Sequence, residues 1–505
     1  MSFSEFFQTP LSLSSPWRAE ELLHRWMKMR LPADEFLKTG AHMEHCANLS
    51  LGPWWTWAEE VEHSPPEHIP FDSFGRRCDV IRTHGSWDQL KRAAAVEGIV
   101  ATAYDRSRGA FARLHQMGLL FLFHPSSSFF SCPLAMTDGA AKVMELLGTT
   151  PRQKQAFKNL TSRDPQMFWT SGQWMTEKTG GSDVSLSRTE ANWEGTELRL
   201  TGEKWFTSAI TADMALMLAR GPAVDESGHR ELCLFYGEIR EPAVGLASGL
   251  NGLTVKRLKN KLGTRALPTA ELSLEGMRVE SVGELGQGVK KISTLLNITR
   301  MYNSVCAISH MKRALDWLEG YAEVRTVFGK KLKEQPLFRR NFEQLQKVYT
   351  DCFLLTFETS YLLGRDECGE ATDEERRFLR ILTPIVKLYT AKRCVQVCSE
   401  VVEGFGGLGY IEDFPVARFY RDAQVFSIWE GTTSVLALDF LRAFQKENGG
   451  ELLRSQKVFS LPSSGVQNFL QEMATLSAND GLAEEAVNLA FEFASLITGS
   501  LVLPA

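Results

Sequence analysis

The feature of this chain that most constrains its fold is a change in the spacing of its apolar residues. Over residues 1–170, stretches such as 19–26 and 87–94 place apolar side chains about every 3.6 positions, which predicts amphipathic helices. Between 171 and 285 the spacing becomes two, as expected of half-buried antiparallel strands. The alternating runs are 197–201, 231–236 and 269–275. The chain therefore carries a β domain between helical segments.

Long helical patterns return after this β segment. They cover 311–324, 338–363 and 374–402, and long helices joined by short links predict an antiparallel bundle. Further patterns at 465–474 and 481–496 predict a helical tail. We therefore expect a mainly α protein with an inserted antiparallel β domain. Its expected parts are an N-terminal helical domain at 1–170, the β domain at 171–285, a helical bundle at 286–445 and a helical tail at 446–505.

Composition limits the partners and compartments of the protein. The net charge of −5 gives the 505-residue chain no bulk positive field that would gather nucleic acid or anionic lipid. No apolar run approaches the roughly 18 residues that a membrane span needs. Nine cysteines without a CxxC pair predict reduced, mostly buried thiols and argue against zinc sites and disulfides. Because the N-terminal residues lack a secretory apolar core, we expect a cytoplasmic protein, with the mitochondrial matrix as the alternative.

One carboxylate near the C-terminal end of the predicted bundle has an unusual setting. Glu430 lies between Trp429 and Gly431, with Ile428 just before, and it closely follows the glycine-rich run 403–410. Apolar neighbours desolvate a carboxyl group and raise its pKa toward the range of a general base. Glu430 is therefore the candidate catalytic group. A solvated glutamate at a helix end is the alternative for such a motif on its own.

Three segments together resemble the acyl-CoA dehydrogenase family of flavoproteins. They are Met-Thr-Glu-Lys-Thr-Gly-Gly-Ser-Asp at 175–183, Lys-Trp-Phe-Thr at 204–207 and the run from Glu403 to Asp422. The resemblance implies that family's fold, with a helical domain, a β domain and a four-helix bundle, and FAD as the cofactor. The segments 8–13 and 71–77, with bulky residues at Trp174 and Leu186, are similar to the AidB-like, alkylation-response branch.

The resemblance also implies a reaction. A base removes the α proton of a medium- or long-chain acyl-CoA while the β hydride passes to flavin N5, which leaves a trans-2,3 double bond. The thioester oxygen then accepts hydrogen bonds as it becomes enolate-like, one of them from the backbone N–H of Glu430, and Gly431 leaves that backbone approachable. Some members keep the base on an earlier helix, where this chain has Thr299 and Arg300, so Glu430 is the remaining family position.

Positions that contact the cofactor and substrate are implied by the same matches. Within the β domain, Met175 and Thr176 would bind the pyrimidine edge of the flavin, Gly181 and Ser182 would lie near the pyrophosphate, Trp205 against the ring and Thr207 near N5. Trp205 as ordinary sheet core is the alternative. Ser182, Arg300 and Gly431 are the implied substrate contacts, with Arg300 holding Glu430 or lining the cavity, and an ordinary helix-surface arginine is its alternative.

A second set of implied contacts depends on assembly. Arg325 and Phe328 belong to an Arg-x-x-Phe-Gly segment in which the guanidinium pairs with the FAD pyrophosphate of a neighbouring subunit. Glu403, Gly406 and Gly407 would meet the same dinucleotide, whereas Thr432 and Ser434 would contact the subunit's own FAD. The resemblance thus implies a dimer of dimers, with an electron-accepting flavoprotein as a further partner. The basic stretch 256–265 would bind the CoA phosphates, form a subunit contact or simply face solvent.

Other functions have weaker support in the sequence. The run 404–409 fits GxGxxG, but a nicotinamide site needs a preceding strand, and 391–402 has a helical pattern. An acyl-CoA-binding or regulatory flavoprotein with little turnover is an alternative, as is an AidB-like DNA-protective protein. Residues 458–505 contain no Lys, Arg or His and five acids, whereas nucleic-acid binding needs cations that neutralise phosphate. Acyl-CoA chemistry or sequestration is therefore favoured over DNA protection.

Overall fold

The computed structural model describes residues 13–224, 229–240, 249–479 and 481–501. It forms two compact units. The helical unit comprises Met1–Gly52, Arg106–Pro125 and Asn303–Ala505, and the β unit comprises Pro53–Asp105 and Ser126–Tyr302. The segment 8–12 of the AidB-like resemblance lies outside the described residues, and the four-part division of the chain stays a prediction.

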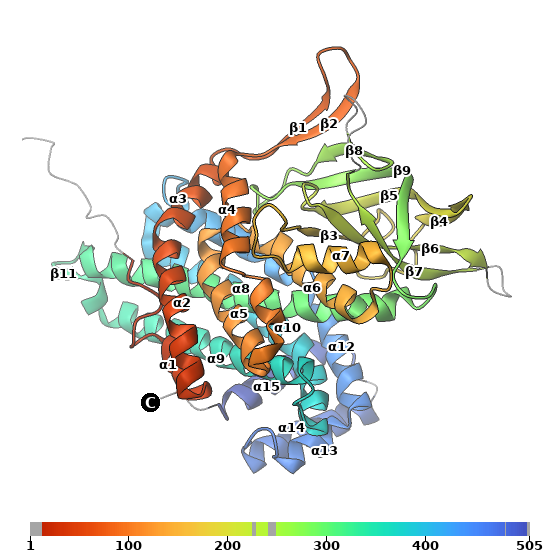
Figure 1. Cartoon of the computed structure of the whole chain (residues 1–505). Helices are drawn as coiled ribbons and strands as arrows, with labels where there is room; N and C mark the ends of the chain where they lie inside the picture. The colour runs from red at the N-terminus through yellow and green to blue at the C-terminus, as the bar shows by residue number, and fades with distance from the viewer. Residues whose placement is uncertain (1–12, 225–228, 241–248, 480, 502–505) are drawn as a thin grey trace, which may run out of the picture. The chain divides into compact units, whose positions relative to one another are not determined.

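The β unit is built on a seven-stranded sheet (Figure 1). Its strands are β3 (Ser171–Trp174), β4 (Glu190–Glu194), β5 (Glu197–Ser208), β6 (Met214–Val224), β7 (Arg230–Glu238), β8 (Leu253–Leu258) and β9 (Thr269–Ser281). The order is β3-β6-β4-β5-β9-β7 with β8 beside β9, and a further pairing of β6 with β7 closes the path into a ring. The alternating runs of the sequence lie in β5, β7 and β9, which confirms an inserted and largely antiparallel sheet.

The β unit also contains helices. They are α3 (Pro53–Glu62), α4 (Gly85–Val96), α6 (Ser131–Leu147), α7 (Pro151–Leu160) and the first turns of α8 (Gly288–Val324). One hydrophobic core joins Leu216 and Leu234 of the sheet to Val143 of α6 and Leu295 of α8. At Gly139 of α6 an added Cβ would lie 2.6 Å from the Leu295 side chain, so only glycine allows α6 and α8 to approach this closely.

A β hairpin interrupts the predicted N-terminal helical domain. It consists of β1 (Glu67–Phe71) and β2 (Arg77–Arg82), which pair in an antiparallel register. Asp72 closes its turn, because one carboxylate oxygen accepts from the backbone N–H groups of Phe74 at 2.8 Å and Arg76 at 3.0 Å. The sequence did not predict these strands, since their exposed and half-buried residues do not alternate clearly.

Long helices dominate the helical unit, as the sequence predicted. Besides the later part of α8, its helices are α1 (Leu22–Arg30), α2 (Ala33–Leu51), α5 (Ala110–Phe123), α9 (Pro336–Glu367), α10 (Asp373–Phe405), α11 (Val416–Ala423), α12 (Thr433–Lys446), α13 (Gly449–Ser455), α14 (Ser463–Ala478) and α15 (Ala486–Thr498). A short hairpin of β10 (Thr326–Val327) and β11 (Lys330–Lys331) links α8 to α9. Among the described residues, no helix is both long and apolar enough to span a membrane.

Helix α15 of the tail is part of the hydrophobic core of this unit. Its Phe493 contacts Phe440 and Phe444 of α12 and Phe469 of α14, with ring centroids 5.1, 6.0 and 5.7 Å apart. Helices α14 and α15 lie at the two predicted helical stretches, although α15 begins at Ala486 and not at the predicted residue 481. Helix α13 is a further helix of the tail that the sequence did not predict. Tilted and edge-to-face ring pairs of this kind add to the stabilisation from apolar burial.

A buried imidazole fixes the short helix α11 to the bundle. His310 of α8 is 1% exposed, lies stacked on Phe419 with centroids 4.0 Å apart, and donates from Nε2 to the Phe419 carbonyl at 2.9 Å. A second buried imidazole, that of His124, has its ring centroid 5.6 Å away. Burial, opposed only in part by the bond to Phe419, lowers the pKa of His310 to about 3.

This histidine should make stability depend on pH. Between pH 6.5, the usual His pKa, and about 3, the unfolded chain binds a proton that native His310 does not, so stability falls as the pH falls through this window. We expect urea denaturation from pH 7 to 4 to show a loss of a few kcal/mol that is smaller in His310→Asn, which keeps an amide donor. His63→Asn, at an exposed site, is the control. Equal losses in all three proteins would contradict this account.

Candidate active site

A buried ion pair organises the first motif of the resemblance. Glu177 follows β3 and is 5% exposed, and Lys204 of β5 is fully buried. The Glu177 carboxylate accepts from Lys204 Nζ at 2.7 Å and from the Arg188 backbone N–H at 2.6 Å. Thr189 donates to the same carboxylate from its hydroxyl at 2.7 Å. Burial pushes the pKa of Glu177 upward, but these donors more than offset it and hold the pKa below its usual range.

The same loop is folded tightly against β5. The backbone N–H of Trp205 donates to the Thr176 carbonyl at 2.9 Å, which fixes these two predicted flavin contacts beside each other. At Gly181 an added Cβ would lie 2.8 Å from the Thr176 hydroxyl oxygen, so this position has room only for glycine. Met175 and Thr176 are half-buried, and Ser182 is exposed. The structure thus brings these five predicted positions together within one loop and one strand.

Trp205 has an electrostatic environment that the sequence did not indicate. Its ring is half-buried, and the ammonium group of Lys259 lies 3.3 Å from the ring centroid, within cation–π distance. Lys259 also forms an ion pair with Glu271 at 2.7 Å. Within the same basic stretch, Lys256 pairs with Glu203, and Arg257 pairs with Glu271 at 2.6 Å. Several cations at 256–265 therefore have partners within the β unit.

Thr207 and Arg300 occupy different settings in the β unit. Thr207 is fully buried, and its hydroxyl donates to the Ala270 carbonyl at 2.7 Å, which leaves its oxygen lone pairs as acceptors. Arg300 is half-buried on α8. Their roles toward flavin and substrate stay predictions.

The two bulky departures from the family pattern differ in the structure. Trp174 is fully buried in the β unit, whereas Leu186 is 60% exposed on a loop. Next to Met175, the side-chain carbonyl of Gln173 is buried and has no hydrogen-bond partner among the described residues. Because buried amides are normally satisfied, Gln173 marks a place where a polar ligand group fits.

In the helical unit, Glu430 occupies a strained turn. It lies between the 3₁₀ turn Gln424–Ser427 and α12, with a φ of +57°, and Gly431 follows with a φ of +105°. Left-handed backbone is unfavourable for a glutamate and marks positions where the surroundings dictate the conformation. Glu430 and Trp429 are half-buried, but Ile428 is 61% exposed. The expectation that Ile428 helps to desolvate Glu430 is therefore wrong for the single chain.

Two buried side chains that the sequence did not identify bind the backbone around this turn. Asn303 of α8 donates from Nδ2 to the Phe426 carbonyl at 3.2 Å, and the ammonium group of Lys387 of α10 donates to the Gly431 carbonyl. The sequence does contain a signal that could have indicated burial of Lys387, because this lysine interrupts the apolar run 385–388. On the other side of the turn, Thr432 is the N-cap residue of α12 and makes no side-chain capping bond, and Ser434 is exposed.

The remaining predicted positions gather at one end of the bundle. Tyr321 of α8 stacks on Phe405 of α10 with centroids 4.5 Å apart, which brings the segment containing Arg325 near the glycines that follow α10. Phe328 is fully exposed in the β10–β11 turn, where its φ is +50°. Glu403, Gly406 and Gly407 are exposed as well, and an added Cβ on either glycine would meet no atom of residues 13–224, 229–240, 249–479 or 481–501 within 4 Å. Bare backbone of this kind lets another molecule approach closely.

These residues fit an FAD molecule. Hydroxyl groups of Ser182, Thr432 and Ser434, the Arg325 guanidinium and open glycine backbone form a donor set suited to a dinucleotide pyrophosphate. The unpartnered carbonyl of Gln173 lies beside the segment that would hold the flavin edge. Ser182 lies in the β unit, whereas Arg325, Thr432 and Ser434 lie in the helical unit.

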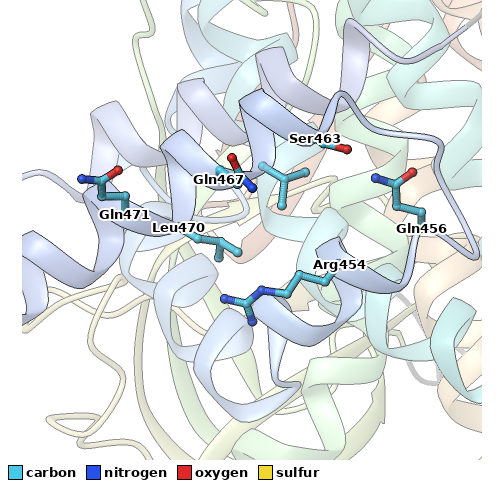
Figure 2. A pocket seen from close by; sticks show the side chains of 7 residues that line it. Arg454, Gln456, Ser463, Gln467, Leu470 and Gln471 are labelled. Atoms are coloured by element: carbon cyan, nitrogen blue, oxygen red, sulfur yellow. The ribbon is translucent and has the colours of Figure 1, made fainter.

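A separate cavity of about 580 Å³ lies between α13 and α14 of the tail (Figure 2). Its lining includes Arg454, Gln456, Ser463, Gln467, Leu470 and Gln471. None of the predicted site residues lines this cavity, so it takes no part in the candidate active site.

Comparisons with known proteins agree with this fold and these motifs. Residues 8–164 match the adaptive response protein AidB N-terminal domain, 172–277 the acyl-CoA dehydrogenase middle domain and 286–444 the acyl-CoA dehydrogenase C-terminal domain. The chain is 41% identical to acyl-CoA dehydrogenase family member 11 of Caenorhabditis elegans, over 88% of this chain and 73% of that protein. It is 30% identical to the putative acyl-CoA dehydrogenase AidB of Escherichia coli, over 82% of this chain and 76% of AidB.

A solved structure gives the same result. The crystal structure of Caenorhabditis elegans ACDH-11 in complex with C11-CoA superposes with a TM-score of 0.91 and 36% sequence identity, covering 100% of this chain and 90% of that one. The fold is thus that of a flavin-dependent acyl-CoA dehydrogenase. The chain belongs to the acyl-CoA dehydrogenase family, in its AidB-like branch. As a member it is an oxidoreductase that acts on acyl-CoA, and its cofactor is FAD.

The buried ion pair yields a stability prediction for the β unit. Glu177→Gln leaves the Lys204 ammonium buried without its carboxylate, which typically costs about 3–5 kcal/mol. We expect urea denaturation at a lower concentration and weaker FAD retention on dialysis. Glu190→Gln is the matched control, because Glu190 forms an exposed pair with Arg230 at 3.3 Å and such pairs contribute about 1 kcal/mol or less. Equal denaturation midpoints for Glu177→Gln and the parent would contradict the assignment.

Proposed function

We propose that this protein introduces a trans-2,3 double bond into medium- or long-chain acyl-CoA thioesters, with Glu430 as the base that removes the α proton. The α C–H of a thioester is a weak acid, so its removal needs a positioned base and stabilisation of the charge that develops on the thioester oxygen. Glu430 supplies the carboxylate, and its own backbone N–H, left accessible by Gly431, donates to that oxygen. When bound, FAD supplies the acceptor for the hydride that leaves the β carbon.

The observation that carries this proposal is the strained turn at Glu430. A glutamate at a φ of +57°, followed by a glycine at +105°, adopts this conformation only because its surroundings require it. Strain of this kind is typical of functional positions. The medium to long chain length is supported by ACDH-11, whose structure was solved with C11-CoA.

The assembly is also part of the proposal. Exposed Phe328, Gly406 and Gly407 support a dimer of dimers in which Arg325 of one subunit pairs with the FAD pyrophosphate of another. An electron-accepting flavoprotein would reoxidise the enzyme. Binding of acyl-CoA with little turnover is the second candidate, because the exposed Ile428 beside Glu430 leaves the base partly solvated within the single chain. DNA protection has less support, since α14 and α15 contain no cationic side chain.

The role of Glu430 is tested by flavin bleaching. Anaerobic mixing of the FAD-loaded protein with saturated acyl-CoAs of graded length should bleach the parent fastest with medium or long chains. Glu430→Gln keeps the shape but cannot take a proton, so we expect its bleaching rate to fall by roughly 100- to 10,000-fold, the range that a positioned base contributes. Equal bleaching by Glu430→Gln would refute the base, and binding of acyl-CoA by a parent that never bleaches would favour the second candidate.

Arg325 provides a test of the assembly. A guanidinium on a pyrophosphate contributes about 1.5–3 kcal/mol, so Arg325→Met should weaken FAD binding by roughly 10- to 100-fold, whereas Arg325→Lys should retain part of it. Fluorescence titration of the apoprotein with FAD measures the change. Arg340→Met, on the exposed surface of α9, is the control and should bind as the parent does. Unchanged affinity in Arg325→Met would remove Arg325 from the site.

A further inference from the structure

We infer that Asn303 and Lys387 are positioning residues that together hold the backbone on both sides of Glu430 in its reactive geometry. This inference deepens the proposed function and rests on it. We call the two residues the backbone clamp. Neither belongs to the motifs that identify the family, and both lie within the same compact unit as Glu430.

The segment that contains Glu430 has little regular structure of its own to hold it. A 3₁₀ turn ends at Ser427, and α12 begins only at Thr433. The residues between them include a glutamate and a glycine with positive φ, at +57° and +105°. A backbone with such dihedral angles relaxes to a commoner conformation unless other groups hold it. Donors from outside the segment are therefore required.

Asn303 supplies the first of these donors. It lies on the long helix α8, is 4% exposed, and donates from its amide to the Phe426 carbonyl at 3.2 Å. Its own side-chain carbonyl is buried and has no hydrogen-bond partner among the described residues. An unsatisfied buried acceptor costs stability, so a leucine of similar size would fill this position at lower cost. The bond to Phe426 explains why an amide is present.

Lys387 supplies the second donor. It lies on α10, is 0% exposed, and donates from its ammonium group to the Gly431 carbonyl. Its neighbours in sequence, Val386 and Leu388, are buried as well. Burying an ammonium group costs free energy that a methionine of similar shape avoids. The bond to Gly431 is the contact by which this ammonium group holds the turn.

The two bonds act at positions on either side of the base. One fixes the carbonyl four residues before Glu430, and the other fixes the carbonyl one residue after it. Both donors come from long helices of the bundle, which are rigid supports for a reactive group. The clamp thus presets the direction of the Glu430 carboxylate and of its backbone N–H. Presetting lowers the entropy lost when the transition state forms, so its loss should reduce kcat more than it changes KM.

Substitutions that remove the donors but fill the space test this inference. The variants are Lys387→Met and Asn303→Leu, with Lys392→Met as the matched control, because Lys392 lies on the exposed face of the same helix. Three measurements are made on each FAD-loaded protein: thermal unfolding, amide hydrogen exchange of residues 426–436, and the rate of flavin bleaching by the best acyl-CoA of the graded series. Exchange is also measured on the apoprotein.

We expect Lys387→Met and Asn303→Leu to unfold at or above the temperature of the parent. Their amides at 426–436 should exchange at least roughly tenfold faster, and bleaching should slow by tenfold or more with little change in the acyl-CoA concentration that half-saturates it. Lys392→Met should match the parent in all three measurements. A merely structural role predicts the reverse pattern, with lower unfolding temperatures and an unchanged bleaching rate in the folded fraction.

Two results would overturn the clamp. One is an unchanged bleaching rate and unchanged exchange in either variant while Glu430→Gln has lost activity, in which case the proposed function stands and the clamp is refuted. The other is a parent that no acyl-CoA bleaches, together with variants whose amides at 426–436 exchange as fast as those of the parent. The missing bleaching then refutes the proposed function, and the equal exchange separately refutes the clamp. If Lys387→Met folds poorly, Asn303→Leu alone decides the outcome.

Discussion

The half of the site that lies in the β unit depends on one interaction, the buried ion pair between Glu177 and Lys204. A charge removed from water is tolerated only when it is paired and hydrogen-bonded, and here a single carboxylate accepts from Lys204, Arg188 and Thr189. The pair ties a loop without regular structure to the middle of β5. Thr176, Gly181 and Trp205 keep their relative positions because that loop cannot move independently of the strand.

A similar arrangement recurs in the helical unit with different chemistry. Lys387 is also fully buried. Near the candidate base, however, its ammonium group donates to a backbone carbonyl, that of Gly431. In both units a lysine from a regular element fixes an irregular segment that carries the site. Helices and strands satisfy their own backbone groups, whereas turns do not, so irregular functional segments need donors from elsewhere. Buried lysines meet that need at a cost in stability.

The sequence predicted the architecture well and the supporting contacts poorly. Periodicity identified β5, β7, β9 and the long helices, because their apolar faces are continuous and repeat regularly. It missed the hairpin of β1 and β2, whose residues lack a clear inward face, and it placed the start of α15 too early. The family motifs gave the site positions. Lys387 does interrupt an apolar run, but no pattern in the sequence separates Lys204 from exposed lysines. Burial is a property of the tertiary structure, and for that reason the exposure of Ile428 could not be predicted either.

The bare glycines after α10 have a consequence for interpreting variants. At Gly407 the described part of the chain leaves open space where a side chain would begin, since none of its atoms lies within 4 Å of that point. A methyl group added there meets none of the residues that the structure describes, so the isolated fold tolerates it. Any penalty that an alanine at 407 brings must therefore originate in a molecule that approaches from outside, and this one position reports on contacts that a single chain cannot make.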